Sequence, residues 1–116
     1  MPNPLIDLSL MRRLASHFVW YRNVHHLSFI EIDDKGCFAG VFPLQEEIAG
    51  TAFFDGVLLP VPADCEEDVS WENWKEVTAG VEAGSPVRII HIAGLDTAAA
   101  KLGTYDSSCR CHIQRL

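Results

Sequence analysis

The chain has 116 residues, enough for one domain whose core needs neither disulfides nor metals. Its 16 acidic and 9 basic side chains give a net charge of −7, which argues against nucleic-acid and anionic-membrane binding, since both need clustered Lys and Arg. The sequence shows no secretory signal and no apolar run of membrane-spanning length, so we expect a cytoplasmic protein whose four cysteines are reduced.

The first part of the chain leaves two alternatives open. Apolar residues between positions 5 and 14 have mixed spacing, so Asp7 or Ser9 could cap a short helix that runs towards Ala15. Alternatively, a strand begins already at Arg12.

Most of the remaining chain has the pattern of β-strands separated by turn residues. Aromatic and β-branched residues dominate these runs. The predicted strands cover residues 16–21, 24–32, 37–42, 52–59, 87–92 and 109–114. The second and third form a hairpin around a turn at 33–36. The fourth contains a turn or bulge at Asp55-Gly56, and Pro60 and Pro62 are expected to end its regular pairing.

One segment has the periodicity of a helix. Apolar residues recur there every three or four positions and form one stripe, at Trp71, Trp74, Val77 or Thr78, and Val81. Ser70 is placed to cap this helix, and Gly80 or Gly84 can end it in a left-handed conformation. We therefore predict a helix at about 70–82, anchored in the core by its tryptophans, and a further helical turn at 97–102.

Together these elements predict a single mainly-β domain over residues 1–116. We expect a small β-sandwich or flattened barrel with one α-helix at about 70–82. An open sheet of this kind leaves unpaired strand edges, through which the chain could pair with itself as a homodimer.

Three segments resemble the amidohydrolase superfamily, in particular its aminodeoxyfutalosine- and guanine-deaminase-like members. They are the hairpin turn Asp33-Asp34-Lys35-Gly36, the run Phe54-Asp55-Gly56-Val57-Leu58-Leu59-Pro60, and the tail from Ile89 to Leu116. Their order is that of the N- and C-terminal strands of the family. The resemblance implies a composite β-sandwich domain, of the kind that lies beside the catalytic barrel in those metal-dependent hydrolases.

The catalytic part of that family has no counterpart in the sequence. In the family the last strand leads into Asn-Ala and a His-x-His metal pair, whereas Ala63 here is followed by Asp64, Cys65 and Glu66. About fifty residues remain after this point, too few for a barrel of roughly 250 residues. The resemblance therefore implies an accessory domain, and it carries no metal ligand over to this chain.

Two groups of residues are weak candidates for a metal site. Asp64 and Glu66 could hold a hard cation, and Cys109, Cys111 and His112 are residue types that bind zinc. Alternate residues of a strand share a face while the residue between them points away, so one strand cannot direct all three of the latter to one ion. We expect the two cysteines to be buried core residues, with metal binding or redox chemistry as alternatives.

The histidines offer a further alternative. His25 and His26 are neighbours on a predicted strand and face opposite ways, so they are poor joint ligands. His17 or His91, on other strands, could meet one of them in space. Exposed or singly hydrogen-bonded histidines are the expectation.

The first functional hypothesis is a non-catalytic structural or interaction module without a cofactor. The alternatives are a small metal- or ligand-binding protein that uses Cys and His residues, and a residual amidohydrolase completed across a dimer. The sequence singles out no catalytic residue, and it names neither a partner nor a biological process.

Overall fold

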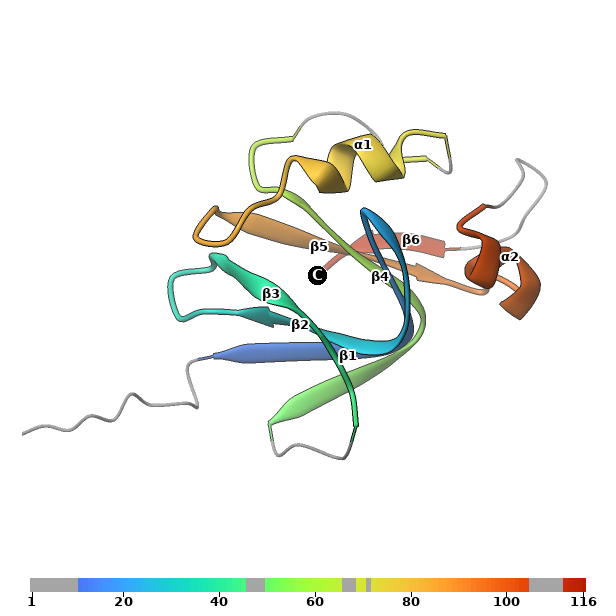
Figure 1. The fold of residues 1–116 in the computed structure, drawn as a ribbon, viewed down its shortest axis with the longest axis horizontal. Coiled ribbons are helices and arrows are strands. Elements are labelled where there is room, and N and C mark those ends of the chain that lie inside the picture. The colour runs from blue at the N-terminus through green and yellow to red at the C-terminus, as the bar shows by residue number, and fades with distance from the viewer. Residues whose placement is uncertain (1–10, 46–49, 66–68, 71, 105–111) are drawn as a thin grey trace, which may run out of the picture.

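The computed structural model describes residues 11–45, 50–65, 69–70, 72–104 and 112–116. The elements in chain order are β1 (Arg12–Tyr21), β2 (Asn23–Ile32), β3 (Phe38–Pro43), β4 (Thr51–Pro62), α1 (Trp74–Ala79), β5 (Val87–Ala93), α2 (Thr97–Leu102) and β6 (His112–Arg115) (Figure 1). Strand content is 53%, which confirms the predicted mainly-β class. Two short helices accompany the strands: α1 lies within the predicted span 70–82, and α2 coincides with the helical turn predicted at 97–102.

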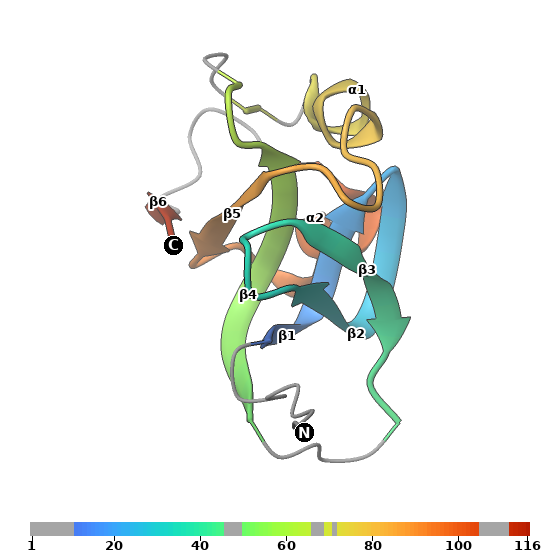
Figure 2. The ribbon, with the colours of Figure 1, turned by 90° about the vertical axis from the view of Figure 1, so that its left-hand side faces the viewer.

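All six strands belong to one sheet with the order β3-β2-β1-β4-β5-β6. The predicted hairpin is confirmed, because β2 and β3 pair antiparallel around a turn in which Gly36 has a φ of 80°. The pairing of β1 with β4 is parallel, and all other neighbours are antiparallel. The sheet is strongly curved (Figure 2), so that Cys37 at the start of β3 bridges to Pro86 ahead of β5. Over the described residues it does not close into a barrel.

The predicted irregularity at Asp55-Gly56 is a bulge. The β1–β4 register shifts between Ser16 and Phe18, where β4 contributes one residue more than β1. Gly56 has a φ of 91°, and a Cβ atom there would overlap the carbonyl oxygen of Ile92. The hydroxyl of Ser16 donates a hydrogen bond to the Gly56 carbonyl. This carbonyl is one of the backbone groups that lose their ladder partner at the bulge, so the hydroxyl replaces that partner.

The prediction that two prolines end the pairing of β4 was wrong. Pro60 pairs with Ile89 and Pro62 with Val87, and the strand continues to Pro62. The pairing of β4 with β1 ends at Leu58, so beyond this residue β4 has a neighbour on one side only. A proline is tolerated there because its missing amide hydrogen is not needed on the unpaired side.

Of the two alternatives for the start of the chain, the strand is confirmed. Strand β1 begins at Arg12 and includes Ala15, so no helix reaches that residue. In the sheet, β1 lies between β2 and β4. Asp7 and Ser9, the caps of the alternative helix, lie outside the described residues.

The helix around Trp74 is shorter than the predicted span 70–82. The backbone N–H of Ser70 donates to the Asn73 side chain, and the Ser70 carbonyl accepts from Trp74, so a separate turn takes the place of the first helical turn. At the other end Gly80 has a φ of −77°, which contradicts the expected left-handed cap. Gly84 does have a positive φ, but it lies in a turn beyond the helix.

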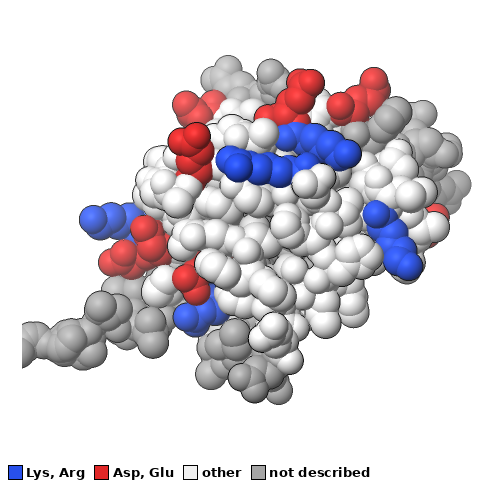
Figure 3. Space-filling view, in the orientation of Figure 1, with Lys and Arg blue, Asp and Glu red and all other residues white. Residues whose placement is uncertain are grey.

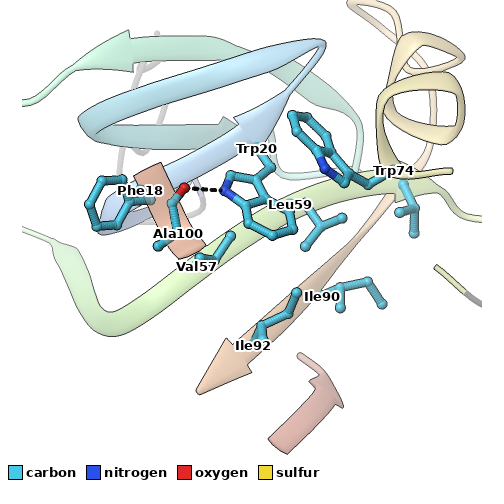
Figure 4. Close-up of a cluster of buried hydrophobic side chains, with 9 residues drawn as sticks. Phe18, Trp20, Val57, Leu59, Trp74, Ile90, Ile92 and Ala100 are labelled. Atoms are coloured by element: carbon cyan, nitrogen blue, oxygen red, sulfur yellow. Dashed lines mark hydrogen bonds between the residues drawn. The ribbon is translucent and has the colours of Figure 1, made fainter. Parts of the chain in front are cut away.

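Two apolar clusters cover opposite faces of the sheet. The first contains Phe18, Trp20, Leu59, Trp74, Ile90, Ile92 and Ala100 among its members (Figure 4). The second contains Leu14, Val19, Ile30, Phe38, Leu58 and Val81. Trp74 is only 1% exposed, which confirms it as a core anchor, while Trp71 lies outside the described residues. Helix α1 thus fixes one end of the sheet, and α2 contributes Ala100 to the same cluster.

Candidate functional site

Most of the predicted metal candidates lie outside the described residues. This applies to Glu66, Cys109 and Cys111, and for His112 only the backbone is described, where it begins β6 opposite Ala93. Asp64 is exposed. Within the described ranges, no three His, Cys, Asp or Glu side chains are grouped so that they could hold a metal ion. On β6 itself, the residue expected to share the buried face with the cysteines, Ile113, is 49% exposed.

The histidines of β1 and β2 partly meet, as one alternative anticipated. His17 and His26 line the same hollow of about 440 Å³, together with Leu27 and residues next to and within α2. Their rings pack edge-on against Phe53 and Phe18, at centroid distances of 5.0 and 5.2 Å. Edge-on packing against phenylalanine is a contact typical of aromatic rings in an apolar surface.

The other two described histidines are tied to the backbone. His25 Nε2 lies 2.9 Å from the Tyr21 carbonyl oxygen, which fits the expectation of single hydrogen bonds. His91 is buried and uses both ring nitrogens, since Nε2 lies 2.6 Å from the Asp55 carbonyl oxygen and Nδ1 lies 3.3 Å from Nε2 of Gln114. A backbone carbonyl only accepts, so Nε2 is the donor to Asp55, while the Gln114 side-chain amide lies against Nδ1. His91 therefore joins the β4 bulge to β6.

An aromatic row crosses four strands on the outer face of the sheet. Residues directly opposite one another on paired strands share a face. The pairings Phe29–Phe42, Ala15–Phe29 and Ala15–Phe53 therefore place one continuous row over β3, β2, β1 and β4. Ala15 and Phe29 are buried within it, whereas Phe42 is 41% and Phe53 is 47% exposed.

Leu27 extends this row along β2. Its side chain is 45% exposed, and its φ of 43° is rare for a residue with a branched side chain. We call the surface formed by Leu27, Phe29, Phe42 and Phe53 the aromatic face. It adjoins the hollow of His17 and His26, because Leu27 lines both.

The aromatic face also has a neutral border. Arg13 lies two residues from Ala15 on β1, and Glu31 lies two residues from Phe29 on β2. The Arg13 Nε atom is 3.0 Å from Oε2 of Glu31. In β3, Gly40 allows the Phe42 ring to lie flat over the strand, since a Cβ atom at Gly40 would come within 2.8 Å of that ring. The face is therefore apolar, shallow and without net charge at this border.

The sequence did not indicate this surface. Its phenylalanines lie on three strands, and only the strand order and register show that they form one row. In the sequence they appear only as apolar residues within separate predicted strands. The described helices are all too short to cross a bilayer. Comparisons of the chain with protein-family models, with curated proteins and with solved structures gave no match in any of the three.

Proposed function

We propose that this chain is a non-catalytic interaction module that uses the aromatic face to bind another protein surface, in the first instance a second copy of itself. The observation that carries the proposal is the row from Phe42 to Phe53, whose end members are 41% and 47% exposed. Phenylalanine buries a large apolar area at a small entropic cost, and aromatic residues are enriched in the centres of protein interfaces. The exposed members Leu27, Phe42 and Phe53 lie around the buried Ala15 and Phe29, so they belong to one surface that spans four strands.

Charge favours a contact at this face over one elsewhere. Each chain carries a net charge of −7, so two copies repel one another through most of their surfaces. Arg13 and Glu31 neutralise each other beside the aromatic face, which lets two copies approach there. Figure 3 shows, on the side it presents, a broad area without Lys, Arg, Asp or Glu side chains, with most of the charged side chains around it.

The sheet edges support self-pairing less well than the face does. At the outer edge of β3, Phe38 already exchanges hydrogen bonds with Gly84 and Ser85, and Pro43 has no amide hydrogen to offer. Strand β6 has four residues, His112–Arg115, which allows only a short ladder with a partner strand. An edge contact through β6 is the alternative form of the same module.

The resemblance to an amidohydrolase accessory domain supports the same proposal. Such a domain lies beside a catalytic barrel and contributes packing surfaces rather than metal ligands. A cytoplasmic location and the absence of a cofactor belong to this proposal as well. So does independence from nucleic acids, which the surplus of acidic side chains supports.

Sedimentation velocity over a wide range of protein concentrations tests the proposal. We expect a monomer–dimer equilibrium in the unmodified chain and monomers only in the double variant Phe42→Ser/Phe53→Ser. The matched control is Leu102→Ser, which removes a side chain that is 74% exposed on α2, away from the aromatic face. A monomer at every concentration, or a dimer that persists in the double variant, contradicts self-association through this face.

A further inference from the structure

A second hollow lies at the opposite end of the sheet from β3. It has a volume of about 340 Å³ and lies over β4, β5 and β6 next to the segment that follows β4. The size is at the lower end of the range of small-molecule sites in proteins. Its lining contains Val61, Cys65, Arg88, Ile90, Ile113 and Arg115. A contiguous shallower hollow shares Arg88 and Arg115 and is bordered by Asp64.

The strand register explains why two arginines meet there. Val61 pairs with Arg88, and Ile90 pairs with Arg115, so all four side chains are on one face of the sheet. Arg88 is two residues before Ile90 and is therefore the diagonal neighbour of Arg115. Diagonal neighbours on a sheet are about 7–8 Å apart at their backbones, well within reach of long side chains.

Neither guanidinium group has a partner within the described part of the chain. The ion pair found there joins Arg13 to Glu31, and neither the Arg88 nor the Arg115 side chain takes part in a hydrogen bond or an ion pair within the described residues. Two like charges on neighbouring strands repel each other unless an anion lies between them. In a chain with a net charge of −7, two arginines that have no carboxylate partner among the described residues are a local reversal of the overall charge.

Part of the lining of the hollow is apolar. Val61 and Ile90 form its floor and belong to the core cluster of this face, and Ile113 is 49% exposed at its side. A ligand that fills the hollow would cover Ile113 and remove its apolar surface from water. The site thus combines a cationic rim with an apolar body, which is the complement of an amphipathic anion.

We propose that this hollow binds a small organic anion, with its oxyanion head between Arg88 and Arg115 and a short apolar body against Val61, Ile90 and Ile113. Guanidinium groups bind carboxylate and phosphate oxygens through paired N–H donors, which gives both charge and geometry. The exposed Asp64 carboxylate borders the rim, and the two arginines outweigh it, so the site favours an anion over a cation. This inference does not depend on the interaction module proposed above.

Isothermal titration calorimetry of the full chain with four probes tests the inference. Hexanoate and hexyl phosphate have both the charge and the apolar body, hexan-1-ol lacks the charge, and inorganic phosphate lacks the body. We expect at least one of the first two to bind about tenfold or more tightly than either of the last two. A preference for hexanoate assigns the site to carboxylates, and a preference for hexyl phosphate assigns it to phosphate esters.

Variants of the lining show whether the binding occurs in this hollow. Arg88→Gln and Arg115→Gln should each weaken binding of the preferred anion about tenfold, whereas Arg12→Gln, the same charge change on the exposed start of β1, should leave it unchanged. Ile113→Ser should weaken hexanoate but not inorganic phosphate. The inference is overturned if no anion binds more tightly than hexan-1-ol. It is also overturned if the double variant Arg88→Gln/Arg115→Gln binds the preferred anion as before and has the melting temperature of the unmodified chain.

Discussion

The indole rings of Trp20 and Trp74 stack with their centroids 4.9 Å apart and their planes inclined by 26°. Each ring nitrogen donates to a backbone carbonyl of the same short stretch, Trp20 to Ala100 at 3.0 Å and Trp74 to Gly103 at 2.7 Å. Through this pair, β1, α1 and α2 are held together, although they are far apart in the sequence. The tryptophans therefore fasten both helices to the sheet.

Replacing Trp74 with Ala should destabilise the fold strongly. The substitution removes a side chain that is 1% exposed and leaves the Gly103 carbonyl without its donor, so we expect a loss of about 3–5 kcal/mol in the free energy of unfolding. Urea denaturation followed by circular dichroism measures it. Lys101→Ala on the exposed side of α2 is the control, and a loss below 1 kcal/mol for Trp74→Ala, roughly that of a surface change, would show that the pair is dispensable.

Gly56→Ala and Gly84→Ala form a matched pair of variants. Comparing them separates the cost of the steric overlap at the bulge from the cost of backbone strain. Both glycines have a positive φ, 91° and 87°, so either alanine adds backbone strain of about 1–2 kcal/mol. Around Gly84 a Cβ atom meets nothing, whereas at Gly56 it overlaps the Ile92 carbonyl of β5. We expect Gly56→Ala to lower the midpoint of urea unfolding clearly more than Gly84→Ala. Equal shifts would mean that β4 and β5 separate easily at this point.

These residues show how far the sequence could predict the fold. The hairpin at 24–42 was predictable because its turn residues and both strands are adjacent in the chain. The bulge at Gly56 was recognisable because a glycine interrupts an apolar strand. The parallel pairing of β1 with β4 was not predictable, because about thirty residues separate these strands and no local pattern specifies their register.

The same limit applies to the candidate sites. Neither the aromatic face nor the hollow of Arg88 and Arg115 has a recognisable motif, because each is assembled from side chains of separate strands. The metal hypotheses included residues that are adjacent in the sequence, such as Cys111 and His112. Adjacency along a strand separates side chains onto opposite faces, while register across strands brings them together.

His91→Phe should loosen β6 more than the rest of the sheet. The change keeps an aromatic ring but removes the hydrogen bonds to Asp55 and Gln114, and it leaves the Asp55 carbonyl unpaired beside the bulge, so we expect a loss of about 1–3 kcal/mol. Hydrogen exchange resolved by residue should show faster exchange in β6 than in β2. Uniform acceleration in both strands would contradict a specific role of His91 in holding β6.

The carboxylate of Asp33 should make the β2–β3 turn sensitive to acid. Hydrogen bonds from the backbone N–H of Cys37, and then of Lys35, hold the pKa of Asp33 below its usual value of 3.8. A carboxylate with a depressed folded-state pKa stabilises the fold above its unfolded pKa, and this contribution is lost as the pH falls through the folded pKa. We expect Asp33→Ala to destabilise the chain at pH 7 and to have a smaller effect below pH 3.8. Chemical unfolding at pH 7 and below pH 3.8 measures the free energy of unfolding of both proteins. An equal destabilisation by Asp33→Ala at the two pH values would assign it to lost packing of the side chain rather than to its charge.

Chelator treatment tests the expectation that Cys109 and Cys111 are core residues rather than zinc ligands. A structural zinc site contributes directly to the free energy of folding, so its removal lowers the melting temperature. We expect elemental analysis of the purified chain to find no stoichiometric metal, and the melting temperature to be the same with and without chelator. Cys37→Ser should likewise leave the metal content unchanged, because this half-buried thiol is at the hairpin turn beside Pro86. Zinc at one equivalent, lost together with stability, would instead show that Cys and His residues form a metal site and that the assignment of Cys109 and Cys111 to the core is wrong.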